Sequence, residues 1–586
     1  MKMGCFPTST RVRGLASYAA LSLFISIGLA RQADAQDRHD HAGPGRGEVG
    51  SYGALAGRPS AAYIESAPPL WTRPGGLEYK ITTGSERAQR YFDQGLRLTY
   101  AFNHAEARRA FRQAQRLDPR CALCYWGEAL VLGPNINAPM DAEAKVPALA
   151  ALRKAQQHAP LASAKEQTLI AALARRYSDD QRVDRKTLDA AYAAAMGQVA
   201  ARFPDDLNIA VLYAEALMDL SPWDYWETGG RRPKGRTQDI LKVLEAVLAK
   251  HPDHAGAIHY YIHVVEASAR PQRAERYADR LAALDLGPGT GHLVHMPSHL
   301  YFRIGRYLDS LAANRRAVAA DETYLREIRA TGIYAEAYYP HAIHMLLVSA
   351  QMAGDGKTAI EAAQRLQTAV SDEAVRTIPW VQPIKSAPYF AHAQLSAPST
   401  ILALRDPGNA FPYVKAAWHY ARGVAFAARR EVKAAEREAQ LIAALRCRHD
   451  FAALMAGGVP AKEVLDLAQH VVLARIAQAQ GKLARAAAEF EQAVAIEDRL
   501  GYMEPPYWYY PVRQSLGAVR LLAGDLSGAE HAFRASLART PNNGWALYGL
   551  REMYARRGDT HAVRDVQHRL AKAWGNQMQK LDLNRL

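Results

Sequence analysis

Seven histidines and one glutamate recur at helical spacing in the middle of the chain. They are His259, His263, Glu266, His292, His295, His299, His341 and His344. His259 and His263 are one helical turn apart, and Glu266 follows on the same face, so one helix can offer two nitrogens and one oxygen to a cation. A set dominated by imidazole suits Zn, Cu, Fe or Ni and argues against Ca or Mg. The spacing therefore predicts a transition-metal site, and no other cofactor.

Two further interpretations fit the same residues. The histidines could form a cationic, hydrogen-bonding groove for an acidic ligand, or they could serve packing alone. Glu266 has three possible roles: a metal ligand, an acceptor that orients an imidazole, or a general base acting on metal-bound water. It is the one candidate catalytic residue, because the sequence contains no nucleophile elbow, phosphate loop, HExxH motif or nucleotide-binding signature.

Three segments rich in aromatic residues and proline interrupt the helical pattern near these histidines. They contain Trp223, Tyr225, Trp226, Trp380, Tyr507, Trp508 and Tyr509. Long connections of this kind are often functional, so we expect them either to form the rim of a ligand groove or to cap apolar edges where the pattern is irregular.

Helices must position all of these residues. From about Ser85 onwards, Ala, Leu, Arg, Glu and Gln dominate segments of helical length, which Gly, Asp or Pro separate. No convincing run of alternating strand residues occurs, so the predicted fold is all-α.

The helical segments recur in pairs. Gly95, Ala107, Phe111, Ala114 and Pro119 have the spacing of the 34-residue tetratricopeptide repeat. Further copies contain Gly517, Ala529, Phe533 and Pro541, then Ala486, Phe490 and Ala493, and, in degenerate form, Gly354 and Ala359. The chain thus resembles bacterial exported tetratricopeptide-repeat proteins over most of residues 85–578. The resemblance implies a right-handed α-solenoid of antiparallel helix pairs, whose concave groove is lined by the first helix of each pair.

The repeat frame places the histidines on that groove. Counting from Ala255, Gly291 and Pro340, all seven occupy the second, fifth or ninth place of a first helix, and Glu266 occupies the twelfth. His259 and His295 both stand at the fifth place of consecutive repeats, so we expect them to meet. Scaffolds of this family commonly hold a protein or peptide partner in the groove.

The N-terminus and the cysteines indicate export. Lys2, Arg11 and Arg13 precede an uncharged stretch from residue 15 to residue 30, and a small-x-small site ends at Ala35. Removal of this signal peptide would leave no membrane-spanning segment. In an oxidising compartment, Cys121 and Cys124 could form a local disulfide, a redox pair or a soft-metal site. We therefore predict an exported, periplasmic protein.

Composition is that of a globular protein, with 49% hydrophobic residues over 586 positions and a net charge of +15. Basic residues are scattered, and an exported protein rarely meets nucleic acid, so we expect no nucleic-acid partner. The predicted organisation is a signal peptide (1–35), a flexible leader (36–84), an N-terminal and central array with the His-lined groove (85–373), an irregular segment (374–412) and a C-terminal array (413–586).

Two functions fit these observations. The first is a scaffold whose groove binds a partner protein or peptide and a transition metal. The second is a metal-dependent enzyme, hydrolytic or redox, with its active site in the groove.

Overall fold

A computed structural model describes residues 58–71, 77–575 and 581–586, and these residues are helical or irregular. They form no β-strand; two isolated bridges, Asn135 with Ala138 and Trp226 with Pro233, are the only β pairing in the described ranges. The all-α prediction is therefore confirmed. The predicted signal peptide lies outside the described residues. Within the described part, no helix is both long enough and apolar enough to span a membrane.

In the described ranges the α-helices follow one another along the chain, with longer connections at 219–236 and 498–511. The first nine are α1 (Ala61–Glu65), α2 (Glu86–Tyr100), α3 (His104–Leu117), α4 (Ala122–Val131), α5 (Lys145–His158), α6 (Ala164–Leu173), α7 (Arg185–Arg202), α8 (Leu207–Met218) and α9 (Thr237–Lys250). The next nine are α10 (Ala255–Val265), α11 (Glu275–Ala283), α12 (Gly291–Ile304), α13 (Tyr307–Ile328), α14 (Tyr339–Met352), α15 (Gly356–Ala369), α16 (Asp372–Thr377), α17 (Val381–Leu395) and α18 (Pro398–Leu402). The last nine are α19 (Pro412–Ala428), α20 (Val432–Arg448), α21 (Ala452–Ala456), α22 (Ala461–Ala479), α23 (Leu483–Glu497), α24 (Val512–Leu522), α25 (Leu526–Arg539), α26 (Gly544–Arg557) and α27 (Thr560–Trp574).

Short helical turns of other kinds connect some of these helices. The 3₁₀ turns are η2 (Ala142–Ala144), η3 (Ala159–Leu161), η4 (Ala174–Arg176), η5 (Pro271–Ala274) and η7 (Leu583–Arg585), and η6 (Tyr334–Tyr338) is a π-helical turn that leads into α14.

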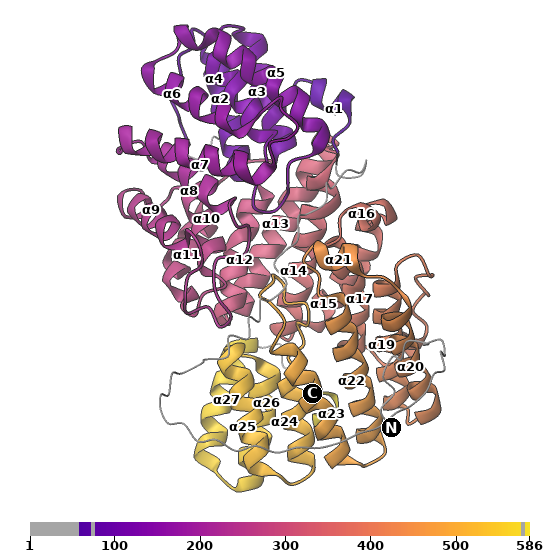
Figure 1. Ribbon diagram of the computed structural model, residues 1–586. Helices are drawn as coiled ribbons and strands as arrows, with labels where there is room; N and C mark the ends of the chain where they lie inside the picture. The colour runs from indigo at the N-terminus through magenta and orange to yellow at the C-terminus, as the bar shows by residue number, and fades with distance from the viewer. Residues whose placement is uncertain (1–57, 72–76, 576–580) are drawn as a thin grey trace, which may run out of the picture. The chain divides into compact units, whose positions relative to one another are not determined.

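Consecutive helices pack as antiparallel pairs, for example α2 with α3 and α22 with α23 (Figure 1). The repeat glycines explain the close approach: a Cβ on Gly95 or on Gly127 would lie 2.7 Å or 2.5 Å from the ring of Phe111, which fills the space between them. The same arrangement recurs near the C-terminus, formed by Gly517, Phe533 and Gly549. Small residues at the crossings and one large ring between pairs build the tetratricopeptide-type solenoid that the spacing predicts.

The described part of the leader, residues 58–71 and 77–84, differs from the prediction. It is packed onto the array, because its polar and aromatic groups find partners there. Arg58 forms an ion pair with Asp141 (2.6 Å), and the backbone N–H of Trp71 donates to the side chain of Gln94 (3.0 Å). The described residues of 36–84 are thus an ordered covering of the first helix pairs.

The segment 374–412 was expected to be irregular but contains most of α16, all of α17 and all of α18. Its prolines are compatible with helices, because Pro398 and Pro412 stand in a first turn, where no backbone N–H is needed. Pro388 lies inside α17. In this segment proline therefore occurs at helix starts as well as in loops.

Cys121 and Cys124 form a disulfide, with Cα atoms 5.4 Å apart. Cys121 is also the N-cap of α4, and its sulfur accepts the backbone N–H of Cys124 (3.2 Å). Of the alternatives left open by the sequence, the structure thus contains the local disulfide.

Candidate metal centre

Three neighbouring helices, α10, α12 and α14, carry all the predicted ligands. His259 and His263 lie on α10, which Glu266 terminates; His292, His295 and His299 lie on α12; His341 and His344 lie on α14. Helix α12 contacts both α10 and α14. Except for the partly exposed His341, these side chains are buried, Glu266 and His259 completely.

One cluster, called the α12–α14 cluster below, contains His295, His299 and His341. The Nε2 atom of His295 lies 2.7 Å from Nε2 of His299 and 3.1 Å from Nε2 of His341, and the remaining pair of Nε2 atoms is 3.3 Å apart. Three nitrogens at such separations surround a space of the size that one cation occupies at Zn–N or Cu–N distances of about 2.0 to 2.2 Å.

Two imidazoles of this cluster have their opposite ring nitrogen held by an acceptor. Nδ1 of His295 donates to Oδ1 of Asn314 (2.6 Å), and Nδ1 of His299 donates to Oε2 of Glu266 (2.9 Å). The orientation of the Asn314 amide is fixed, because its Nδ2 donates to the carbonyl of Ser310 (3.0 Å). With Glu266 ionised, both neutral imidazoles carry their proton on Nδ1 and present the lone pair of Nε2 to the centre.

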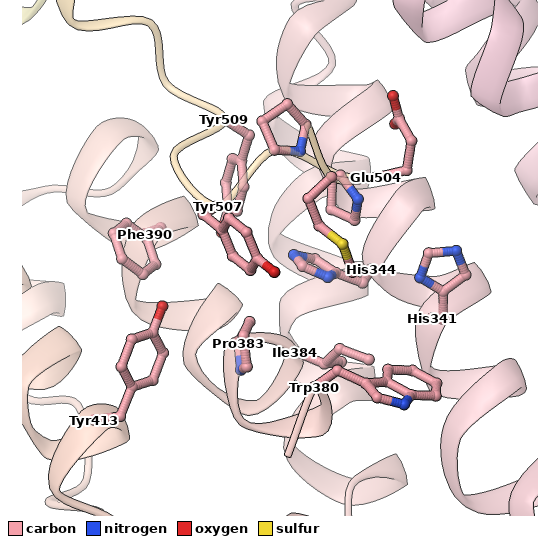
Figure 2. A pocket seen from close by; sticks show the side chains of 13 residues that line it. His341, His344, Trp380, Pro383, Ile384, Phe390, Tyr413, Glu504, Tyr507 and Tyr509 are labelled. Atoms are coloured by element: carbon pink, nitrogen blue, oxygen red, sulfur yellow. The ribbon is translucent and has the colours of Figure 1, made fainter. Parts of the chain in front are cut away.

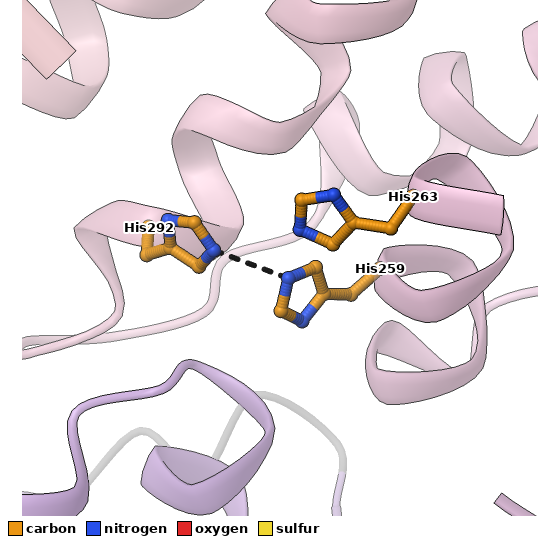
Figure 3. Close-up of side chains that lie close together, drawn as sticks. All are labelled: His259, His263 and His292. Carbon is orange, nitrogen blue, oxygen red and sulfur yellow. Dashed lines mark hydrogen bonds between the residues drawn. The ribbon is translucent and has the colours of Figure 1, made fainter. Parts of the chain in front are cut away.

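A second cluster, called the α10–α12 cluster, contains His259, His263 and His292 (Figure 3). Their ligand atoms all lie within 4.8 Å of one another, and Nε2 of His259 is 3.1 Å from Nε2 of His292. Nδ1 of His259 donates to the carbonyl oxygen of Tyr100 (2.7 Å), and Nδ1 of His263 donates to Oε1 of Glu266 (3.0 Å). Nε2 of His263 is buried without a hydrogen-bond partner among the described residues. Here too, Nε2 lone pairs converge.

Aromatic rings enclose the α10–α12 cluster. The ring centroids of Phe102 and His259 are 4.5 Å apart, and those of Trp223 and His263 are 5.0 Å apart. Tyr338 packs edge-on against His292, with 5.0 Å between the ring centroids. Phe102 and Trp223 both have left-handed backbone angles, with φ of 54° and 65°. Such angles cost about 1 to 3 kcal/mol in a non-glycine residue and concentrate at functional sites, where the surrounding structure imposes them.

Burial keeps the imidazoles neutral. It lowers the pKa of His259 and His299 to about 3, and it holds the pKa of His295 and His341 well below the ordinary value, with nearby histidines adding to the effect. Burial also raises the pKa of Glu266 well above its usual range. Neutral imidazole is the form that binds a metal, and a cation beside Glu266 would favour its ionised form.

A narrow pocket borders the α12–α14 cluster. Its free volume of about 20 Å³ is enough for a water-sized molecule, and His341 and His344 line one side of it (Figure 2). Most of the other lining residues are aromatic, proline or aliphatic: Trp380, Pro383, Ile384, Phe390, Tyr413, Met503, Pro505, Pro506, Tyr507 and Tyr509, with Glu504 as the acidic member. Neither ring nitrogen of His344 has a hydrogen-bond partner among the described residues, and His344 belongs to neither cluster.

The structure thus brings six of the seven histidines together, but in two groups. His259 and His295, expected to meet because they hold equivalent places in consecutive repeats, lie in different clusters. The histidines are also not exposed along an open groove. Glu266 hydrogen-bonds one imidazole of each cluster, and with His263 and His299 it also forms a third group of side chains that could bind a metal ion.

The predicted rim residues have separate environments. Trp223 packs on His263, whereas Trp380, Tyr507 and Tyr509 line the pocket. The other three lie elsewhere: the carbonyl of Tyr225 accepts from Thr237, the indole of Trp226 donates to the carbonyl of Val264, and Trp508 packs on Phe390 and Tyr420.

Four residues of the site were not predicted from the sequence: Tyr100, Phe102, Asn314 and Tyr502. The hydroxyl of Tyr502 donates to Glu504, and a hydrogen bond between Tyr502 and Glu266 partly opposes the rise in the pKa of Glu266. The aromatic segment that contains Tyr507, Trp508 and Tyr509 thus begins beside the centre. Phe102, two positions after the last residue of α2, has a left-handed backbone, and its residue type does not indicate this. Asn314 on α13 stands 19 residues from its partner and looks like any helical asparagine.

No family model matches the chain, and no curated protein matches it. Among solved structures, it is similar to the human IFIT1 dimer with m7Gppp-AAAA, at 12% identity and a TM-score of 0.30, covering 85% of this chain and 92% of that one. It is also similar to Naa15/Naa10 bound to HypK-THB, at 14% identity and a TM-score of 0.20, covering 83% of this chain and 70% of that one. At these TM-scores the likeness carries no argument about the site.

Proposed function

We propose that this protein is a metal-dependent enzyme built on a tetratricopeptide-type array, with a transition-metal ion bound by Nε2 of His295, His299 and His341. The observation that carries the proposal is the short separation of these three nitrogens, 2.7 to 3.3 Å. Three imidazoles leave a further coordination position for water or substrate, as in catalytic His₃ sites.

The distribution of protons over the ring nitrogens supports a cation between these imidazoles. When Glu266 is ionised, His295 and His299 both carry their proton on Nδ1 and their Nε2 lone pairs face each other at 2.7 Å, an arrangement that a cation between them stabilises. Burial opposes a proton in that place, because it depresses the pKa of both rings. A metal ion satisfies the three lone pairs at once.

Burial also favours small-molecule chemistry over a scaffold that holds a peptide against the histidines. His295 and His299 are 1% and 2% exposed, so a folded partner cannot reach them. The pocket beside His341 has room for a water-sized molecule next to one ligand of the cluster. A protein partner remains part of the proposal only for the outer surface of the array.

We also propose that the protein is exported to the periplasm. The basic head, apolar stretch and small-x-small site of residues 1–35 support this, and the disulfide between Cys121 and Cys124 suits an oxidising compartment. N-terminal sequencing of protein from its native compartment should give Gln36 as the first residue. An intact Met1 in protein from the cytoplasm would contradict export.

The metal site is tested by elemental analysis of protein purified without a histidine tag and dialysed against zinc or copper. We expect at least one tightly bound ion per chain, and a loss of at least one ion in His295→Ala. The matched control is His392→Ala, because His392 is similarly buried but hydrogen-bonds only Ser396, outside both clusters. A metal-free wild-type protein, or equal metal content in the two variants, would overturn the proposal.

A further inference from the structure

The two histidine clusters have the same construction. In each cluster, two imidazoles donate Nδ1–H to an oxygen atom. The accepting oxygens belong to Asn314 and Glu266 in the α12–α14 cluster, and to Tyr100 and Glu266 in the α10–α12 cluster. In each, Nε2 atoms converge. An arrangement that orients lone pairs for one cation is therefore present twice.

The clusters are adjacent. The rings of His263 and His299 are 5.6 Å apart, and those of His292 and His295 are 5.9 Å apart. Within the clusters, ring separations run from 4.6 Å, between His295 and His299, to 6.1 Å, between His263 and His292. Rings of different clusters are thus as close as rings of one cluster.

Glu266 joins the two clusters. Its carboxylate uses Oε1 for His263 and Oε2 for His299, and both bonds go to Nδ1, the ring nitrogen away from the converging lone pairs. The carboxylate therefore orients one ligand of each cluster. With Glu266 in this role, each ligand set consists of three neutral imidazoles.

We propose that the two clusters together form a dinuclear copper centre, one ion in each, close enough to share one small bridging oxygen ligand such as hydroxide. This deepens the proposed function and rests on it. Separations of about 3.5 to 4 Å are usual for paired ions that act on one molecule.

Copper suits the ligands and the surroundings. Among divalent ions of the first row, Cu²⁺ binds nitrogen sites most tightly. Phe102, Trp223 and Tyr338 pack on the α10–α12 cluster, and the carboxylate of Glu266 hydrogen-bonds one imidazole of each cluster. Imidazole nitrogens are ligands that copper accepts, so three of them can hold one copper ion in each cluster.

The experiment loads the full-length protein with Cu²⁺ and measures total copper, Cu⁺ by a colorimetric chelator, and the integrated electron paramagnetic resonance signal. We expect two Cu²⁺ per chain, no Cu⁺, and a signal that accounts for less than about a tenth of the copper, because the spins of bridged ions pair. The double variant His259→Ala/His263→Ala should bind one Cu²⁺ with full signal intensity.

Other results have distinct meanings. Two Cu²⁺ with full intensity, or one Cu²⁺ in the wild type, would overturn the dinuclear centre without overturning metal binding by the protein. No bound metal at all would overturn the proposed function itself. If the double variant lacks the helical circular dichroism of the wild type, His292→Asn replaces it. The copper content and signal of the wild type are by themselves sufficient to decide whether the centre is dinuclear.

Discussion

Replacement of Glu266 by glutamine tests the role of the shared carboxylate. The two oxygens of Glu266 accept Nδ1–H from His263 at 3.0 Å and from His299 at 2.9 Å. A glutamine side chain has nearly the same shape but one oxygen only, so its amide N–H₂ group must face one of the two imidazoles. That imidazole then has to accept at Nδ1 and carry its proton on Nε2, which blocks its lone pair for the metal.

The expected loss falls on one cluster. Removing a partner that orients a ligand typically costs 10- to 100-fold in metal affinity, or about 1.4 to 2.7 kcal/mol. The cluster that keeps the amide oxygen should retain affinity within about threefold. Competition titrations with a chelator of known affinity, using Zn²⁺ and Cu²⁺, would show one weakened and one nearly unchanged binding event in Glu266→Gln.

The matched control is Glu438→Gln. Glu438 is also a buried carboxylate that accepts from a histidine Nδ1, that of His419 at 2.5 Å, but it lies outside both clusters. Its replacement should change metal affinity by less than twofold. Equal affinities for Glu266→Gln, Glu438→Gln and the wild type, in protein with unchanged circular dichroism, would refute the orienting role.

Three further predictions concern the surrounding structure. Gly256→Ala should destabilise the fold by about 1 to 3 kcal/mol and weaken metal binding in the α10–α12 cluster, because the new Cβ would lie 2.6 Å from the ring of Tyr100; unchanged urea unfolding would contradict this. Burial lowers the pKa of His104 from 6.5 to about 4, so below pH 6.5 the unfolded chain binds a proton that the folded chain does not bind until about pH 4. Between about pH 7.5 and about pH 5.5, the free energy of unfolding of the metal-free protein should therefore fall by about 1.3 kcal/mol because of this residue. The free energy of unfolding of His104→Gln should fall by correspondingly less over the same pH range. The disulfide closes a loop with a sequence separation of 3, so Cys121→Ala/Cys124→Ala should lower the free energy of unfolding by only about 2 kcal/mol, and a non-reduced peptide map should show the linked pair in the wild type.

The helical fold could be predicted because its determinants are local or repeat at fixed spacing. Phe111 and the glycine that precedes it by 16 positions, Gly95, are in contact, and the same spacing of Gly517 and Phe533 gives the same contact. Packing within a repeat depends on residues a few turns apart, so sequence periodicity is sufficient to identify it.

The departures from the predictions arise where context outweighs residue type. Pro398 and Pro412 resemble loop residues in the sequence, yet both stand in the first turn of a helix. The leader resembles a flexible chain by composition, but Arg58 and Trp71 find partners at Asp141 and Gln94. Neither partner is near in the sequence, so local patterns cannot reveal these contacts.

The sequence by itself determined the helix pairs and the turns that carry the histidines, because helical periodicity fixes which residues share a face. Only the tertiary structure decided that His259 and His295 belong to different clusters, since that depends on how α10 and α12 are offset and on which ring nitrogen each acceptor holds. It also decided that the histidines are buried, because the rings that enclose them, such as Phe102, come from distant segments. Local periodicity reflects short-range packing, whereas a site assembled from several segments depends on contacts between residues far apart in the chain.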